Sequence, residues 1–309
     1  MTMYDDSRDE ERTLHGNTPD DGRRDALRAY FSSLGWGTGV HAGLVFDFLR
    51  RAAAASRGGA ILDAGAGHQR YRPFFEGSHY IAQEHPVAGA ANKGIVDYDI
   101  LCDVRRIPLR DDSVDAVLST SSLEHIEFPD AFFAEALRVL RPGGTLFVQV
   151  PFVYPEHEVP YDFQRPTRYG LERWYRHAGF DRIEVVPASS SIYAATAFLK
   201  TAMFEGMRNP ARLPGLGGRL RALADPRLPA RALLYLLAVA PLAKLLNLLL
   251  DRRPGPDAIF PIGWIAQGRK PGDAGTSAAH ATPKADFLRE RMLPDGTFEL
   301  RDGVIRPRG

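Results

Sequence analysis

Short apolar runs alternate with stretches of helical periodicity through the middle of the chain. In the stretch 129–140, for example, Phe132, Phe133, Ala136 and Leu137 recur at helical spacing. The predicted strands are 60–62, 79–83, 100–102, 114–118, 145–150, 183–186 and 259–267, and the predicted helices are 25–34, 40–56, 129–140 and 167–179. This alternation predicts right-handed βαβ units and an α/β fold with a doubly wound, Rossmann-like sheet.

The flanks of this pattern predict separate segments. Residues 1–24 are polar and without periodicity, so we expect a disordered tail. The α/β domain should comprise residues 25–188 and 257–269, with residues 189–256 forming an apolar helical insertion before the last strand. Residues 270–309 are rich in glycine, alanine, serine and proline and predict a flexible tail, in which an Asp-Gly pair between apolar residues indicates a small hairpin.

The insertion contains an apolar stretch, 229–250, that is about long enough to cross a bilayer. Pro241, Lys244 and Asn247 lie inside it, and charged groups near the centre of a span are costly. Arginines flank it on both sides, as they would flank an interfacial helix. Three alternatives stay open: a packed cap or homo-oligomer interface, an element on a membrane surface, and a true span.

Composition and charge narrow the class of protein. The 309 residues are 44% hydrophobic and 25% charged, which is ordinary for a globular protein. The net charge of +1 lacks the basic excess of a general nucleic-acid binder, so no nucleic-acid partner is expected. Cys102 is the single cysteine, which fits a reducing compartment, and the acidic N-terminus does not match a secretory signal. We therefore expect a cytoplasmic protein, peripheral at the inner face of the membrane if the insertion touches lipid.

A glycine turn follows the first predicted strand. Asp63 ends that strand, and Gly65 and Gly67 come next. Ligands bind outside the carboxyl ends of strands in open α/β sheets, where glycine allows the backbone to approach them closely. A dinucleotide site would need a small residue at position 70, where Arg70 stands, so a nicotinamide dehydrogenase is disfavoured. An acidic turn suits a cofactor with an ammonium and a sulfonium better.

Two further acids end the next two predicted strands. Glu84 follows Asp63 by 21 residues, the usual offset for a carboxylate that accepts hydrogen bonds from ribose hydroxyls. Asp103 could accept the exocyclic amine of adenine, with Val104 beside the ring. Three acids at one sheet edge predict an adenosine-containing ligand.

Four motifs together resemble class I S-adenosylmethionine-dependent methyltransferases, in particular the small-molecule and glycan type found near bacterial glycan and lipid biosynthesis. The motifs are Asp63-Ala64-Gly65-Ala66-Gly67, Ile107 to Val117, Leu123-Glu124-His125-Ile126 and Arg138 to Gly144. The resemblance covers about residues 58–187 and the strand near 260 and implies a seven-stranded sheet. It also implies that Asp63, Gly65 and Gly67 hold the cofactor's amino-acid end, Glu84 the ribose, and Asp103 and Val104 the adenine. The chain departs from the family at His68-Gln69, where a third glycine or small residue is usual.

The acceptor side is predicted from two loops. His125 follows the fourth strand and could act as general base near neutral pH, as could His157. The segment 151–167 leaves the fifth strand, and loops at this edge carry recognition residues. Its substrate candidates are Tyr161, Asp162 and Arg165. One histidine between two acids in Glu156-His157-Glu158 is a weak ligand set, so no metal is expected.

The predicted function is S-adenosylmethionine-dependent methyl transfer to a small-molecule, sugar or lipid-linked acceptor, on oxygen, by in-line displacement. The protein would mainly supply proximity and alignment, worth roughly 7–11 kcal/mol. The alternative is a catalytically inactive relative that binds a partner through the helical insertion, and the departure at His68-Gln69 is its main support.

Overall fold

The computed structural model describes residues 40–91, 96–203, 235–251, 260–272 and 295–308, with residues 254, 258, 288–289 and 291–293. The tail predicted over 1–24 and the helix predicted over 25–34 lie outside the described residues, as does the middle of the insertion.

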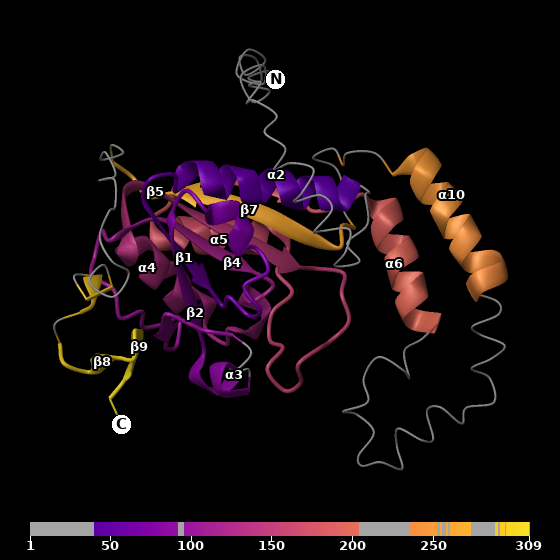
Figure 1. Cartoon of the computed structure of the whole chain (residues 1–309). Coiled ribbons are helices and arrows are strands. Elements are labelled where there is room, and N and C mark those ends of the chain that lie inside the picture. The colour runs from indigo at the N-terminus through magenta and orange to yellow at the C-terminus, as the bar shows by residue number, and fades with distance from the viewer. Residues whose placement is uncertain are drawn as a thin grey trace, which may run out of the picture. The chain divides into compact units, whose positions relative to one another are not determined.

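A mixed sheet of nine strands organises the described chain (Figure 1), in the order β6-β7-β5-β4-β1-β2-β3-β9-β8. The strands are β1 (Ala60–Ala64), β2 (His79–Glu84), β3 (Ile100–Leu101), β4 (Val114–Thr120), β5 (Leu140–Pro151), β6 (Asp181–Pro187), β7 (Gly263–Arg269), β8 (Phe298–Arg301) and β9 (Val304–Pro307). Strands β1 to β5 pair in parallel, and β7 lies antiparallel between β5 and β6. The doubly wound α/β fold is confirmed. The parallel strands end at one edge, which carries the predicted site loops.

The strand count differs from the predicted seven because the C-terminal hairpin joins the sheet. Ile305 of β9 pairs in parallel with Ile100 of β3, and β8 pairs antiparallel with β9. Asp302 and Gly303 turn the hairpin with φ of 54° and 77°, the left-handed geometry that Asp-Gly favours. Residues 298–307, expected in a flexible tail, therefore extend the main sheet, and β7 is not the last strand.

Helices cover both faces of the sheet. α2 (Val40–Ala55) packs on one face, where Phe48 meets Phe147 of β5 edge to face. α4 (Pro129–Val139) and α5 (Arg168–Ala178) pack on the other, where Phe133 and Tyr175 join the buried cluster with Leu146. Side chains alternate along β5, so Phe147 and its neighbour Leu146 serve opposite faces. The predicted helices 129–140 and 167–179 are confirmed to within two residues.

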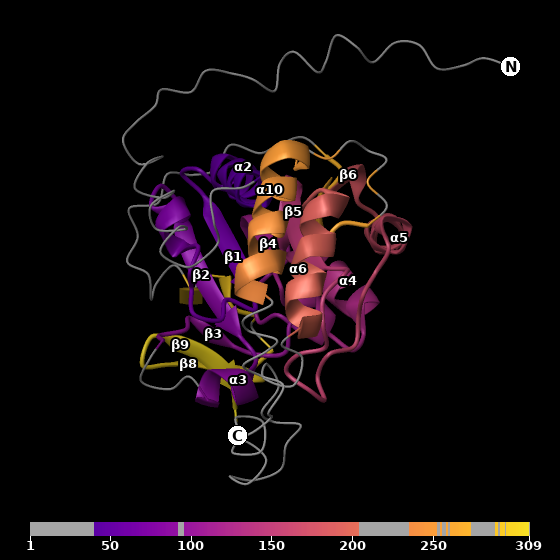
Figure 2. The same cartoon turned by 90° about the vertical axis from the view of Figure 1, so that its right-hand side faces the viewer.

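The insertion contributes two helices that lie side by side (Figure 2): α6 (Ser191–Met203) and α10 (Ala240–Leu250), which follows a π-helical turn (Tyr235–Val239). Asn247 Nδ2 donates to Thr196 Oγ1 at 3.1 Å and joins them. α6 begins just after β6, whose end lies at the carboxyl edge of the parallel strands. No described residue of α10 is fully buried, and Leu248 is 79% exposed. Within the described segments, every helix is too short or too polar to cross a bilayer.

Candidate functional site

Hydrogen bonds with β2 and with Tyr98 hold the glycine turn after β1. Gln83 Oε1 accepts a hydrogen bond from Gly65 N at 3.0 Å, and Glu84 Oε2 accepts one from Gly67 N at 2.8 Å. The Tyr98 hydroxyl donates to Gly67 O at 2.8 Å. Both glycines have left-handed φ, 79° at Gly65 and 50° at Gly67. These three hydrogen bonds therefore hold the turn in place without a ligand.

The two glycines are required for different reasons. A Cβ at Gly65 would lie 2.5 Å from Ser122 Oγ and 2.6 Å from Ser122 Cβ, so this glycine allows contact with the loop after β4. A Cβ at Gly67 would meet nothing within 4 Å among the described residues. Gly65 therefore serves internal packing, whereas Gly67 faces open space in which a ligand could approach the backbone.

Asp63 is buried at the end of β1. The residue is 1% exposed, and its Oδ2 accepts a hydrogen bond from the hydroxyl of Tyr80. Oδ1 has no hydrogen-bond partner among the described residues. Burial raises the pKa of Asp63 to about 7, although the Tyr80 hydrogen bond opposes the rise. A cation near Oδ1 would therefore favour the ionised carboxylate.

The other two predicted cofactor acids differ in their surroundings. Glu84 lies at the end of β2, where its second oxygen, Oε1, accepts from His85 N at 2.8 Å. Asp103 follows β3 and is half-buried, and both its oxygens accept hydrogen bonds from Arg105. Partial burial alone would raise the pKa of Asp103, but the Arg105 guanidinium lowers it. Val104 packs partly buried against the core.

Gln69 takes a backbone conformation that normally favours glycine. Its φ is 50°, and it belongs to the His68-Gln69 pair where a third glycine or small residue is usual in the family. Gln69 Nε2 donates to the carbonyl of Asp97, and Arg72 Nη1 donates to Gln69 Oε1 at 3.0 Å. The side chain thus tethers the turn that a glycine would form without help. The departure at His68-Gln69 leaves a left-handed turn in place.

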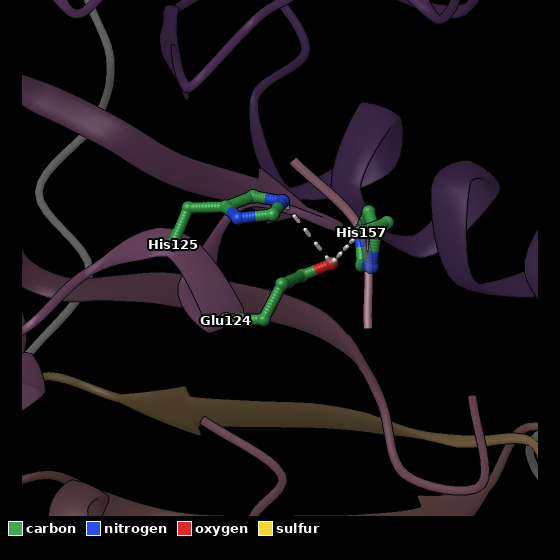
Figure 3. Close-up of side chains that lie close together, drawn as sticks. All are labelled: Glu124, His125 and His157. Atoms are coloured by element: carbon green, nitrogen blue, oxygen red, sulfur yellow. Dashed lines mark ion pairs between the residues drawn. The ribbon is translucent and has the colours of Figure 1, made fainter. Parts of the chain in front are cut away.

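The loop after β4 brings a buried acid to both candidate bases (Figure 3). Glu124 and His125 lie on a short 3₁₀-helix (Leu123–His125), and His157 comes from the loop after β5. Glu124 Oε1 lies 3.9 Å from His125 Nε2 and 3.6 Å from His157 Nε2. The nearby Glu124 carboxylate raises the pKa of His157, against the effect of partial burial. The structure thus brings together two histidines that are 32 residues apart.

Two of the three substrate candidates bind each other. Arg165 Nη1 lies 2.6 Å from Asp162 Oδ1, and Nη2 donates to Asp162 Oδ2 at 2.7 Å. Asp162 also accepts from the backbone N of His157 at 2.9 Å, so this pair braces the loop. Tyr161 is 61% exposed, and its carbonyl accepts a hydrogen bond from His125 Nδ1 at 2.7 Å. Of these residues, Tyr161 has the side chain most accessible to an acceptor.

Ser122 connects the glycine turn to the Glu124–His125–His157 cluster. Its hydroxyl donates to Ala64 O at 3.0 Å, and it lies two residues before Glu124. The cofactor-side and acceptor-side candidates therefore occupy one continuous part of the sheet edge.

Sequence reasoning missed four residues that build this edge. Gln83 and Tyr80 lie inside predicted strands, and their polar side chains in apolar runs were the available signal. Glu124 belongs to one of the four family motifs, but its position there predicts no role for it. Ser122 carries no signal in the sequence, because its importance comes from a contact with Gly65.

Part of the chain matches known methyltransferase sequences. Residues 62–148 match the family model described as a methyltransferase domain. The ubiquinone/menaquinone biosynthesis C-methyltransferase UbiE of Cupriavidus necator is 40% identical over 132 residues, covering 33% of this chain and 54% of that protein. An uncharacterized 37.1 kDa protein in transposon TN4556 of Streptomyces fradiae is 34% identical over 143 residues, 41% of each. The matches thus span about half or less of these curated relatives.

Among solved structures, phosphoethanolamine N-methyltransferase 2 of Haemonchus contortus, in complex with S-adenosyl-L-methionine, is 17% identical. The likeness covers 74% of this chain and 52% of that one, with a TM-score of 0.40.

Proposed function

Residues 62–148 form a class I S-adenosylmethionine-dependent methyltransferase domain, and from this premise we propose that the protein methylates an oxygen of a small-molecule, sugar or lipid-linked acceptor. The observation that carries the proposal is the single edge on which Ser122 joins the glycine turn to the Glu124–His125–His157 cluster. The glycine turn suits an adenosine with a cationic arm, and the Glu124–His125–His157 cluster suits an acceptor.

The residues on the cofactor side fit S-adenosylmethionine. Asp63 keeps a buried oxygen without a hydrogen-bond partner in the described structure, and a cationic amino-acid arm would supply one. The open space at Gly67 lets that arm approach the backbone. Glu84 would hold the ribose hydroxyls, and Asp103 with Val104 would hold the adenine. Asp103 would have to loosen its pair with Arg105 to accept from the base.

The cofactor supplies a methyl group on a cationic sulfur, so transfer to a hydroxyl forms an O–C bond, leaves the S–C electron pair on sulfur and releases the hydroxyl proton. The chain must align the acceptor oxygen with that methyl group and place an acceptor for the proton. The cluster beside Ser122 is where we propose that the acceptor oxygen lies. Whether His125 or His157 receives the proton stays a prediction.

Calorimetry with S-adenosylhomocysteine tests the cofactor site. Gly67→Arg should abolish binding, because its side chain would occupy the open space beside the turn. Gly296→Arg is the matched control, since Gly296 also has a left-handed φ, 75°, and a Cβ added there would meet nothing within 4 Å among the described residues. Unchanged binding by Gly67→Arg would refute the site. Binding by the wild type without turnover on any acceptor pool would favour the inactive relative.

The insertion supports a lipid-linked acceptor. Exposed leucines run along α10, and α6 starts at the same sheet edge as the site loops. We infer that this helix pair rests on the inner face of a membrane and brings the site to a lipid-linked acceptor. The described residues of α10 include one cation, Lys244, which an anionic lipid surface would attract.

Vesicle co-sedimentation tests the membrane contact. Leu248→Glu with Leu249→Glu should abolish binding to anionic vesicles, because both leucines are more than half exposed, at 79% and 57%. Val87→Glu on α3 (Pro86–Ala91) is the control, since Val87 is an apolar residue 68% exposed elsewhere. Absence of wild-type binding, with a dimer in solution that the double substitution dissociates, would assign the face to a second copy instead.

A further inference from the structure

Glu124 is a fully buried acid that lies between the two candidate bases. The residue is 0% exposed, and neither Oε1 nor Oε2 has a hydrogen-bond partner among the described residues. Burying a carboxylate costs several kcal/mol unless a cation or donors compensate it. Its backbone carbonyl is fully used, because Phe163 N donates to it at 2.7 Å and Gln164 N at 3.2 Å. The backbone contacts therefore fix Glu124 in place, and its carboxylate faces the two histidines without a hydrogen bond among the described residues.

Both neighbouring histidines direct the same ring nitrogen at this carboxylate (Figure 3). His125 Nδ1 contacts Tyr161 O at 2.7 Å. His157 Nδ1 contacts Pro155 O at 3.2 Å and Asp162 Oδ2 at 3.3 Å. Tyr161 O can only accept, so His125 Nδ1 carries a hydrogen. His157 Nδ1 also lies 3.5 Å from Arg165 Nη2, a donor, but its two closer partners are acceptors and favour a hydrogen on this nitrogen too. In a neutral ring with a hydrogen on Nδ1, Nε2 has a free lone pair that can bind a metal ion.

This is the arrangement that proteins use to orient metal-binding imidazoles. A ligand histidine usually donates its other N–H to a carboxylate or a backbone carbonyl, which fixes the tautomer and the ring. Here one ring uses a carbonyl and the other uses a carbonyl with Asp162, which Arg165 in turn holds. The outer contacts of a metal site are therefore present around both rings.

The spacing of the three inner atoms suits one ion. Glu124 Oε1 lies 3.6 Å and 3.9 Å from the two Nε2 atoms, and the three ligand atoms lie within 4.8 Å of one another. Ligand bonds of about 2.0–2.2 Å at a tetrahedral centre place ligand atoms roughly 3.4 Å apart. Small rotations of the two partly exposed imidazole rings would bring the ligand atoms to that separation.

We propose that Glu124, His125 and His157 bind one divalent transition-metal ion of the zinc type. Two imidazoles and one carboxylate are a ligand set for Zn²⁺ or Fe²⁺, whereas Mg²⁺ and Ca²⁺ prefer oxygen. Three protein ligands leave a coordination position open. Glu158, with Oε2 at 3.7 Å from His125 Nε2, lies at the exposed side of the site.

The sequence alone predicts no metal, because it shows only one histidine between acids on one loop. The structure adds Glu124 and His125 from a second loop. The two histidines would then be metal ligands and not the general bases that the sequence predicts. A role of the ion in holding the acceptor oxygen rests on the proposed methyl transfer, but binding of the ion does not.

Metal binding to the full chain tests the proposal without cofactor or acceptor. After treatment with a chelator, calorimetry should show one Zn²⁺ bound per chain. Co²⁺ should give visible d–d absorption typical of nitrogen and oxygen ligands, and Mg²⁺ should not compete. His157→Ala, His125→Ala and Glu124→Gln should each weaken Zn²⁺ binding by more than the roughly 10–100-fold that loss of an outer contact costs.

The control is His177→Ala. His177 Nδ1 lies 3.2 Å from Asp130 Oδ1, so it is also a histidine beside a carboxylate, but outside the cluster, and its loss should leave Zn²⁺ binding unchanged. Circular dichroism checks folding, and the two histidine variants keep the test valid if Glu124→Gln does not fold. Absence of stoichiometric Zn²⁺ and Co²⁺ binding, or equal affinity in the cluster variants, overturns the proposal. Calorimetry with S-adenosylhomocysteine on the same samples separates that failure from failure of the cofactor site.

Discussion

Gly65→Ala should destabilise the protein far more than Gly67→Ala, although both glycines have left-handed φ. A non-glycine residue in that conformation costs about 1–2 kcal/mol at either position. At Gly65 the new Cβ would also lie 2.5 Å from Ser122 Oγ and 2.6 Å from Ser122 Cβ, and overpacking of this kind costs about 1–3 kcal/mol. We therefore expect a loss of about 2–5 kcal/mol for Gly65→Ala and about 1–2 kcal/mol for Gly67→Ala.

A double-mutant cycle isolates the contact. Ser122→Gly removes both atoms that a Cβ at Gly65 would meet. In that background Gly65→Ala should lower the free energy of unfolding by only about 1–2 kcal/mol, the cost of left-handed φ for alanine. Urea unfolding followed by tryptophan fluorescence gives the four free energies of unfolding. A coupling energy near zero, or equal costs for Gly65→Ala and Gly67→Ala, would refute the assignment of Ser122 as the reason for this glycine.

Asp63 should make the free energy of unfolding pH-dependent, because burial raises its pKa to about 7 from 3.8. Its contribution is fully present below about pH 4 and is lost as the pH rises through 7, so Asp63→Asn should raise the Tm relative to wild type at pH 8 and not at pH 4. Gln69→Gly should be more stable than Gln69→Ala by about 1 kcal/mol in urea unfolding, because only alanine must hold φ near 50° without a tether. Equal stabilities would show that Gln69 is unstrained. Ile305→Ala should cost about 2–4 kcal/mol in the same assay, because Ile305 is 0% exposed, whereas Val304→Ala, on the less buried neighbour, should cost under about 1 kcal/mol.

Local patterns in the sequence determine most of the elements. The helical spacing of Phe132, Phe133 and Ala136 identified α4, and all three are fully buried. Asp302-Gly303 identified the hairpin β8–β9. The position of that hairpin beside β3 could not be predicted, because it depends on long-range contacts such as the pairing of Ile100 with Ile305 and the hydrogen bond from Ile305 N to Asp99 O at 2.7 Å.

The site divides in the same way. Asp63, Gly65 and Gly67 could be proposed as a cofactor turn from the sequence because they lie within five residues of one another. The cluster around Glu124 was not, because His157 reaches it only through the path of a long loop. That path depends on several bonds across the sheet edge, such as Trp264 Nε1 to Pro166 O at 3.1 Å. Contacts of this kind leave no periodic trace in the sequence.

The pairing of β6 with β7 makes the helical insertion a removable unit. Pro187 at the end of β6 lies opposite Trp264 of β7, and Ala188 N still donates to Gly263 O at 2.9 Å. The chain therefore leaves the sheet and returns to it at adjacent positions, as in a hairpin with a very long loop. A short turn could join the two strands, with an entropy cost of closure roughly 2–3 kcal/mol lower. Other segments could be grafted at this point while the order of the strands, and with it the cofactor edge, stays the same.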